Sequence, residues 1–409
     1  MKIMIIGAGP AGVTVAETLR QYDDQAEITM LSSEPFPPYA PPALIEYFIT
    51  GREAHFWKGK DLPERLRLDY RPGTRVVAVQ PEQHTLRLAG GGTLAYDQLV
   101  IATGSRLYAP VPGADKPGIY NFKSLSAAEE LVRRVREGRA HSALIVGAGF
   151  IGVEIALLLR ELGLAVTQVE MTNRVMPRML DVETSEIALG MMRERGLDVR
   201  LNTKVLAFLG QTRAEAVELE SGERLAADLL VAATGVKPNI EFLEGSGVET
   251  RWGVLADDHL RTNVPDVYAA GDVAETMDRI TGERYVHAIF PNAVAQGRVV
   301  AYNLLGWDVP YEGADSMNSL KHLGVPIIAI GRMEGEELRV RRDGSLRKLY
   351  LQNDRIVGFR LAGDIRAAGI YRTLMNKQVD VGPFKHRLLE LGFGMGYVEG
   401  LALSPELTA

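Results

Sequence analysis

Two short glycine-rich turns are the residues of this chain best suited to chemistry. Both have the spacing GxGxxG. The first turn consists of Gly7, Gly9, Pro10, Ala11 and Gly12, and the second of Gly147, Gly149, Phe150, Ile151 and Gly152. Each turn follows an apolar run and opens a helix-like stretch, so that a helix N-terminus with unpaired N–H groups would face a pyrophosphate. The glycines let the backbone approach that group. We therefore expect the chain to bind two dinucleotides.

An acidic residue follows each turn by about 20 residues, where a hydrogen-bond acceptor for a ribose is expected. Glu34 comes shortly after the predicted strand 27–31, and its alternative role is a solvated loop residue. Glu170 ends the predicted strand 166–170. A 2'-phosphate about 4 Å from a carboxylate would cost on the order of 4 kcal/mol per unit charge at an effective dielectric of about 20. Glu170 therefore favours NAD over NADP, although Arg174 could soften this preference.

Two further segments repeat each other. Residues 96–104 and 228–235 each form a buried strand that ends in Ala-Thr-Gly, and each follows a glycine turn in the same order. This repetition predicts two related dinucleotide-binding domains, with the second inserted into the first. A proline-rich stretch, 35–42, is expected to be a stiff, extended loop that either walls in a cofactor or connects two elements.

Composition removes several kinds of chemistry. The 409 residues contain no cysteine, so the chain cannot supply a redox disulfide, a thiolate-bound iron–sulfur cluster or a Cys-type zinc site. The seven histidines show no tight ligand spacing, and no metal site is expected. A formal charge of -6 without long basic runs argues against nucleic acid as a partner. No secretory segment and no apolar run of about 18 residues is present, which predicts a cytoplasmic protein without a membrane partner.

A fifth motif, TNVPDVYAAGD at 262–272, completes a set that resembles the FAD- and NAD(P)-dependent pyridine nucleotide-disulfide oxidoreductase superfamily. All five motifs occur in the order typical of that family, across roughly residues 1–305. The resemblance implies an α/β fold with two Rossmann-like dinucleotide-binding domains, the NAD domain inserted in the FAD domain, and a smaller α+β C-terminal domain. The expected boundaries are 1–110 and 242–312 for the FAD domain, 111–241 for the NAD domain, and 313–409 for a C-terminal interface or electron-acceptor domain.

The resemblance also implies the residues that bind each cofactor. FAD is expected at Gly7, Gly9, Pro10, Ala11, Gly12, Glu34, Pro42, Val76, Ala102, Thr103, Gly104, Gly271, Asp272, Pro291 and Asn292. NAD is expected at Gly147, Gly149, Phe150, Ile151, Gly152, Glu170 and Gly235. Glu154 matches a family glutamate near the nicotinamide, and its alternative role is a solvent-facing helix residue. Pro291 and Asn292 would open a helix, with Gln296 and Gly297 in its first turns, whose N-terminus points at the flavin and stabilises its anionic reduced form.

The chain departs from the thiol-using members of the family, which place redox cysteines after the first βαβ unit or in the loop that follows it. It resembles instead the cysteine-free branch, which includes reductases of rubredoxin and of oxygenase ferredoxins, and more loosely the flavoprotein subunits of oxidoreductases that act on 2-oxoacids or carbon monoxide. Pro41 and Glu46 stand where those reductases tend to carry Arg and Lys. The identity of the electron acceptor is therefore left open.

Two C-terminal features have alternative explanations. Five basic residues could dock an acidic electron carrier or belong to a solvated hairpin; they are Arg339, Arg341, Arg342, Arg347 and Lys348. Aromatic and apolar residues among the glycines of 382–409 could bind a partner protein or pack onto their own domain; they are Phe384, Phe393, Met395 and Tyr397.

The expected activity is an FAD-dependent exchange of electrons between NAD(H) and a one-electron carrier or iron–sulfur partner, either as a homodimer or as a subunit of a hetero-complex. One alternative is an NADH oxidase or quinone reductase that acts directly on a small acceptor. Another is a non-catalytic, FAD-bound redox sensor or scaffold.

Overall fold

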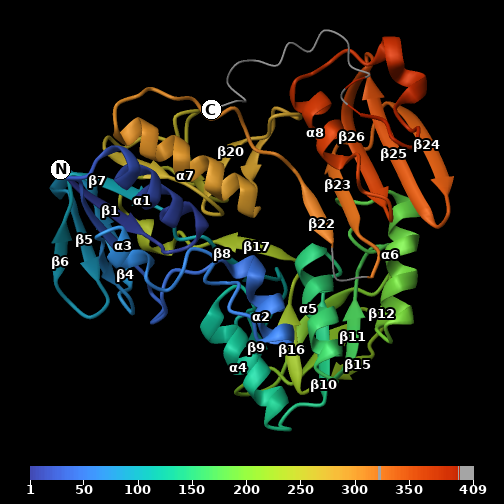
Figure 1. Cartoon of the computed structure of the whole chain (residues 1–409). Helices are drawn as coiled ribbons and strands as arrows, with labels where there is room; N and C mark the ends of the chain where they lie inside the picture. Colours follow the sequence, from blue (N-terminus) through green and yellow to red (C-terminus); the bar gives the residue numbers. More distant parts are fainter. Residues whose placement is uncertain (321–323, 395, 397–409) are drawn as a thin grey trace. The chain divides into compact units, whose positions relative to one another are not determined.

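A computed structural model describes residues 1–320, 324–394 and 396, which divide into two compact units. The first unit comprises Met1–Val175 and Met192–Asp315. The second comprises Met176–Met191 and the described part of Ser316–Ala409. Figure 1 labels the elements of both.

The first sheet of the first unit is built around the first glycine turn. Its five parallel strands lie in the order β19-β7-β1-β2-β3, with bounds Val267–Ala269, Gln98–Ile101, Lys2–Ile6, Glu27–Leu31 and Asp69–Arg71. The three strands β1, β7 and β19 are apolar apart from their ends and almost wholly buried, as expected when helices cover a parallel sheet, whereas the edge strand β3 is polar and partly exposed. Helices α1 (Pro10–Tyr22) and α7 (Phe290–Leu304) pack against each other (Figure 1). An added Cβ at Gly297 would lie 2.6 Å from the carbonyl oxygen of Ala11, so only glycine permits this approach.

The second sheet repeats this design. Its five parallel strands lie in the order β12-β11-β10-β16-β9, with bounds Asp198–Arg200, Ala165–Val169, Ser142–Val146, Leu229–Ala232 and Ile119–Tyr120. Helix α5 (Phe150–Glu161) follows β10, as α1 follows β1. Three-stranded antiparallel sheets accompany both: β4 (Val76–Gln80), β5 (Thr85–Leu88) and β6 (Thr93–Ala95), and β13 (Val205–Leu209), β14 (Ala216–Leu219) and β15 (Arg224–Ala226). The expected fold class, with two Rossmann-like halves, is confirmed.

Shorter elements complete the first unit. They are η1 (Pro41–Ala43), α2 (Leu44–Thr50), α3 (Leu62–Arg65), η2 (Pro81–Gln83), α4 (Leu125–Arg136), η3 (Glu241–Leu243), β18 (Val254–Leu255), β20 (Ala274–Met277) and β21 (Arg284–Val286). Strands β8 (Ser105–Tyr108) and β17 (Gly235–Pro238) pair antiparallel where the chain leaves and re-enters the first half. The proline-rich stretch forms no strand and bends at residues 35, 36 and 38; Ala40 is extended, and the last two prolines begin η1.

The second unit is a smaller α+β body. Its antiparallel sheet has the order β22-β23-β26-β25-β24, with bounds Asn318–Leu320, Ile327–Gly331, Arg355–Ala362, Ser345–Gln352 and Glu336–Arg342. Helices α8 (Ala368–Asn376) and η4 (Gly382–Arg387) follow the sheet. Residues 176–191, which include most of α6 (Val182–Glu194), also belong here, although the sequence placed them within 111–241. The other domain boundaries remain predictions.

The described end of the C-terminal segment packs back onto its own unit. Phe393 is 5% exposed and its ring stacks on Tyr371 at a centroid distance of 6.1 Å. Phe384 stacks on Phe393 at the same distance. Met395 and Tyr397 lie outside the described residues. Over the described ranges, no helix combines the length and apolar character that crossing a bilayer requires.

Candidate dinucleotide sites

The three glycines of the first turn are glycine for two different structural reasons. At Gly7, where φ is +116°, a Cβ would clash with the carbonyl oxygen of Ala102, and at Gly12 it would clash with that of Gly7. A Cβ at Gly9 would meet nothing within 4 Å. Gly9 is also the N-cap of α1 and offers no side-chain cap to its N–H groups. The middle glycine thus has open space in front of it and lies at the helix N-terminus, where backbone N–H groups can donate hydrogen bonds. Both features fit a pyrophosphate bound there.

The second turn has the same geometry. A Cβ at Gly147 (φ +102°) would lie 2.5 Å from the carbonyl oxygen of Ala233, and one at Gly152 would clash with that of Gly147. A Cβ at Gly149 would again meet nothing within 4 Å, and Gly149 caps α5 without a side-chain hydrogen bond. Phe150 and Ile151 form the first turn of α5. Both turns therefore fit a dinucleotide, and the repetition rests on geometry as well as on sequence.

The strand ends next to the turns are held by an unforeseen asparagine. Thr103 donates from its hydroxyl to the carbonyl oxygen of Asn239 (2.8 Å), and the Asn239 side chain donates back to the Thr103 carbonyl (2.9 Å). Gly104 follows with a φ of +67° and Ala102 is buried. In the second half, Gly235 is exposed at the start of β17, opposite Tyr108 of β8. No motif in the sequence singled out Asn239, because its partners lie 136 residues away.

Glu170 closes back onto its own glycine turn. One carboxylate oxygen accepts a hydrogen bond from the Ala148 backbone N–H (2.9 Å), and the other accepts from the N–H and hydroxyl of Thr172, both at 3.0 Å. Glu170 is 7% exposed and immediately follows β11. A buried carboxylate at this point keeps the position beside the turn negatively charged.

Glu34 has different partners from Glu170. It lies three residues beyond β2, and its carboxylate accepts hydrogen bonds from the Ser126 N–H (3.1 Å), the Leu125 N–H (3.3 Å) and the Tyr39 hydroxyl. Burial and the charge of Glu34 together raise the pKa of Tyr39 well above its usual range. Glu34 thus binds the N-terminus of α4, where the helix dipole favours a negative charge. Its expected contact with a ribose stays a prediction.

Asp272 is an ion-pair partner that links the two halves. Its Oδ2 lies 2.6 Å from Nζ of Lys123 and accepts a hydrogen bond from the Ser105 hydroxyl (3.0 Å). The two charged side chains are only 14% and 20% exposed. Before Asp272, Gly271 has a φ of +81° and donates from its N–H to the Gln296 side chain of α7 (2.7 Å). Lys123 and Ser105 were not foreseen, since a lone lysine and serine form no motif.

The start of α7 differs in one respect from the expectation. Pro291 lies in the first turn and the helix has neither a side-chain N-cap nor an acidic residue there. The Asn292 side chain is 4% exposed and bonds reciprocally to the backbone of Asp315, at 2.9 and 3.1 Å. The N-terminus of α7 can therefore accept an anionic group, but the Asn292 amide serves the chain and only its backbone is available to a flavin.

Three other residues that were predicted to lie near a cofactor range from buried to exposed. Val76 begins β4 with its side chain in the apolar core, so only its backbone could touch a cofactor. Pro42 is exposed within η1. Glu154 is half-buried in α5, five residues after its N-cap Gly149.

The basic residues of the C-terminal unit are largely neutralised. Nζ of Lys348 lies 2.9 Å from Asp181 and 3.1 Å from Glu183, Arg339 and Arg341 pair with Glu183, and Arg347 pairs with Asp364 at 2.5 Å. Lys348 and Arg347 are only 7% and 6% exposed. This hairpin therefore matches neither expectation in full: four of its five basic side chains pair with carboxylates, so they form neither a fully solvated hairpin nor an unpaired basic surface.

One group of described residues has the composition of a cation site. Asp257, Asp258 and His259 place ligand atoms within 4.8 Å of one another. Both imidazole nitrogens of His259 already face carboxylates, those of Asp258 (2.7 Å) and Asp308 (3.2 Å). The imidazole of this cluster already pairs with Asp258 and with Asp308, so the geometry gives no reason to expect a metal.

Comparisons with known proteins agree with this geometry. The family model "Pyridine nucleotide-disulphide oxidoreductase" matches residues 1–297. The chain is 29% identical, over 97% of its length and 96% of the relative's, to the NADH-dependent phenylglyoxylate dehydrogenase subunit epsilon of Aromatoleum evansii. It is 31% identical to an NADH oxidase of Methanocaldococcus jannaschii, over 76% of this chain and 71% of the relative. The fold superposes with a TM-score of 0.86 and 27% identity on the ferredoxin reductase for the CYP199A2 system of Rhodopseudomonas palustris, over 97% of this chain and 99% of the other.

Proposed function

Because the chain belongs to the pyridine nucleotide-disulphide oxidoreductase family, we propose that it is an FAD-dependent enzyme that passes electrons between NAD(H) and a one-electron carrier. The observation that carries this proposal is the pair of open glycine turns, at Gly9 and Gly149, within one unit of a chain without cysteine. Two dinucleotides can be held, and this chain has no thiol with which they could exchange electrons.

The protein's own contribution is binding and orientation. The N-termini of α1 and α5 would hold the two pyrophosphates, while Asp272 and the start of α7 would hold FAD. When bound, FAD supplies the chemistry that the side chains lack, because it accepts two electrons together and releases them singly. The overall reaction balances as NADH giving NAD⁺, one proton and two electrons, which reduce two one-electron acceptors.

The acceptor is proposed from the relatives. A ferredoxin reductase and a dehydrogenase subunit both match almost the whole chain, which supports an iron–sulfur protein or a larger complex as partner. We therefore propose such a partner for this chain. The cytoplasmic location stays a prediction.

Anaerobic stopped-flow mixing of the FAD-loaded protein with NADH tests the proposal. We expect the flavin absorbance to bleach and then to recover on addition of a ferredoxin or rubredoxin. An unbleached flavin at saturating NADH would refute it.

Direct reduction of oxygen is the second candidate, favoured by the match to an NADH oxidase. The same reduced protein mixed with air-saturated buffer decides between the two. Reoxidation by oxygen faster than by the carrier protein would favour the oxidase.

A further inference from the structure

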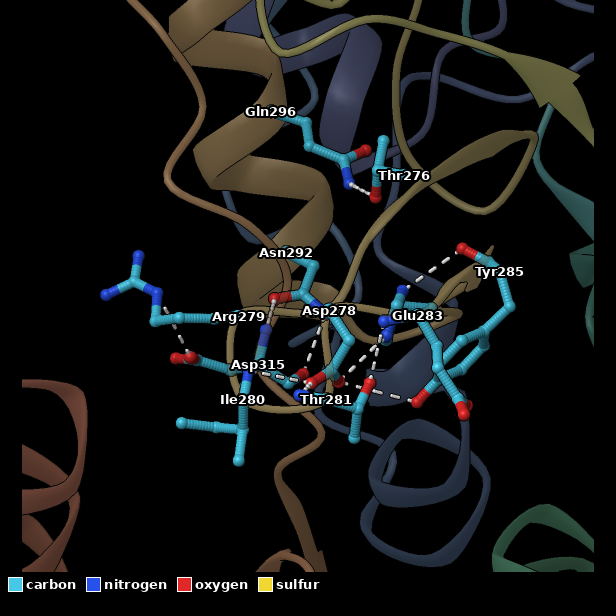
Figure 2. Close-up of polar contacts among 11 residues, drawn as sticks. Thr276, Asp278, Arg279, Ile280, Thr281, Glu283, Tyr285, Asn292, Gln296 and Asp315 are labelled. Atoms are coloured by element: carbon cyan, nitrogen blue, oxygen red, sulfur yellow. Dashed lines mark hydrogen bonds and ion pairs between the residues drawn. The ribbon is translucent and has the colours of Figure 1, made fainter. Parts of the chain in front are cut away.

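A buried polar cluster lies where three segments of the first unit meet. They are the hairpin between β20 and β21, the segment 311–315 that leads out of the unit, and the start of α7. Figure 2 shows Asp278, Arg279 and Asp315 gathered beside Asn292, with Gln296 one turn further along the helix. Arg279 donates from its backbone to the Ala314 carbonyl (3.0 Å), so the hairpin and the outgoing segment are joined. None of the cofactor contacts proposed above explains why a charged pair is buried here.

That pair is Asp278 and His287, whose side chains are 2% and 1% exposed. Nε2 of His287 lies 3.1 Å from Oδ2 of Asp278, and Nδ1 lies 3.2 Å from the carbonyl oxygen of Tyr285. The Tyr285 ring covers the imidazole at a centroid distance of 3.7 Å. Both ring nitrogens therefore face oxygen atoms.

These partners specify the protonation state. A carbonyl oxygen only accepts hydrogen bonds, and an ionised carboxylate also only accepts. The other oxygen of Asp278 accepts from the backbone N–H groups of Ile280 (2.9 Å) and Thr281 (2.8 Å), which favours the ionised form. A neutral imidazole has one bare nitrogen, and either choice would turn a lone pair toward an oxygen. With Asp278 ionised, a doubly protonated His287 donates to both oxygen atoms.

Other charges near the pair belong to the hairpin and to the outgoing segment. Arg279 pairs with Glu312 at 2.8 Å and lies 3.9 Å from Asp315. Tyr311 contributes a hydroxyl whose pKa burial raises to about 12. The hydroxyl of Tyr285 lies 3.5 Å from Oδ2 of Asp278. Among the described residues, Asp278 is the carboxylate that pairs with His287.

The backbone connects this pair directly to the helix. His287 precedes the N-cap Ile289 by two residues, and its carbonyl oxygen accepts a hydrogen bond from the Ile289 N–H (2.8 Å). The Ile289 carbonyl in turn accepts from Ala293 in the first turn of α7 (3.1 Å). A shift of His287 would therefore displace the first turn.

We propose that His287 is a positioning residue whose imidazolium, clamped between Asp278 and the Tyr285 carbonyl, fixes the N-terminus of α7. The consequence for FAD rests on the proposed function, since that N-terminus is expected to face the flavin. The clamp itself is independent of FAD. Loss of either of these two contacts opens the clamp on one side. The first turn of α7 then loosens and FAD leaves faster.

The test compares the full-length wild-type protein with His287→Gln and with the matched control His259→Gln. His259 also has both nitrogens facing acceptors, but its side chain is 19% exposed and its carbonyl oxygen accepts a hydrogen bond from Asn303 near the other end of α7. Hydrogen exchange of peptides covering 288–297 is measured at pH 7 without FAD. The rate of FAD release from the loaded proteins is measured at the same pH by the fluorescence of the freed flavin.

We expect His287→Gln to lose protection over 288–297 by about tenfold relative to the wild type, as for the loss of one charge-assisted hydrogen bond. His259→Gln should follow the wild type. FAD release should accelerate in His287→Gln only. Protection over 288–297 in His287→Gln equal to that of the wild type would overturn the proposal. A chain that binds no FAD would refute the proposed function, and the exchange data would still decide the role of His287.

Discussion

Glycines that look equivalent in a motif have different physical roles in this chain. Gly7 and Gly12 are required by the packing of the protein against itself, because a methyl group would collide with backbone oxygens. Gly9 and Gly149 face open space, so packing within the chain does not require glycine there, and a bound cofactor is expected to require it. Folding and cofactor binding can therefore be separated by single substitutions within one turn.

Gly12→Ala is expected to destabilise the protein by at least about 1–3 kcal/mol, the cost of overpacking a filled site. Gly9→Ala should leave stability within about 0.5 kcal/mol but weaken FAD binding at least about tenfold, since its methyl group occupies the pyrophosphate position. Urea unfolding without FAD and FAD titration measure the two effects. Gly90→Ala, at another open glycine in a surface turn, is the control that should change neither. Undiminished FAD binding by Gly9→Ala would contradict the assignment.

Glu170 should determine the choice of nicotinamide cofactor. Replacing it with serine removes the negative charge beside the second turn, and we expect kcat/KM for NADPH to rise at least about tenfold. KM for NADH should also rise, since the hydrogen bond that holds the Ala148 N–H is lost. Steady-state kinetics with both cofactors make the measurement. Glu161→Ser, at the exposed end of α5, serves as control. A variant that still rejects NADPH would show that another group sets the preference.

Among the secondary-structure elements, α6 and β25 depend on each other through charge. Lys348 is buried in β25 and pairs with Asp181 and Glu183 at the start of α6. Burial alone would raise the pKa of Asp181, but hydrogen bonds from Lys348 and Thr184 outweigh it and hold that pKa below its usual value. This interaction explains why residues 176–191 belong with the C-terminal sheet.

Lys348→Met should strongly loosen this unit, because removing one member of a buried ion pair costs about 3–5 kcal/mol. Hydrogen exchange of peptides from β24, β25 and β26 at pH 7 measures the loss locally. Arg342→Met, which changes an exposed charge at the hairpin turn, is the control. Protection equal to that of the wild type would show that the pair adds nothing to stability.

The pH dependence of this unit follows from the lowered pKa of Asp181. A carboxyl whose pKa is lower in the folded state stabilises the fold above its ordinary pKa of about 3.9, and this stabilisation is lost as the pH falls through the folded value. Wild-type protection of β25 should therefore decrease below about pH 4. In Lys348→Met the decrease should be smaller, because protonation then relieves uncompensated carboxylates. An equal decrease in both proteins would contradict this explanation.

Within the first unit, polar contacts join the two nucleotide-binding halves. Lys123 and Ser105 bind Asp272, and Glu34 binds the N-terminus of α4. These contacts connect the first half to the second half or to the segments that lead into it. The relative orientation of FAD and NAD should therefore depend on a few side chains.

Lys123→Met is expected to slow flavin bleaching by NADH about tenfold or more while changing the affinity for NADH less, because orientation rather than binding is lost. FAD affinity should also fall. Stopped-flow traces at several NADH concentrations separate the rate from the affinity. Lys116→Met removes a lysine whose Nζ donates to the carbonyl oxygen of Gly210, and this variant should behave as the wild type. A change in NADH affinity alone would refute the orienting role.

The sequence determined the repeated glycine turns, the strands before them and the absence of thiol chemistry, because these depend on local spacing and composition. It therefore predicted the two-Rossmann fold and the class of reaction correctly. Tertiary structure decided which groups the polar side chains meet. Asn292 bonds to Asp315, Glu34 to α4, Lys123 to Asp272 and Lys348 to α6, and His287 has acceptors on both nitrogens. Apart from His287, these partners are 23 to 167 residues apart along the chain, and a hydrogen bond or ion pair is set by distance in space, which periodicity and spacing do not encode.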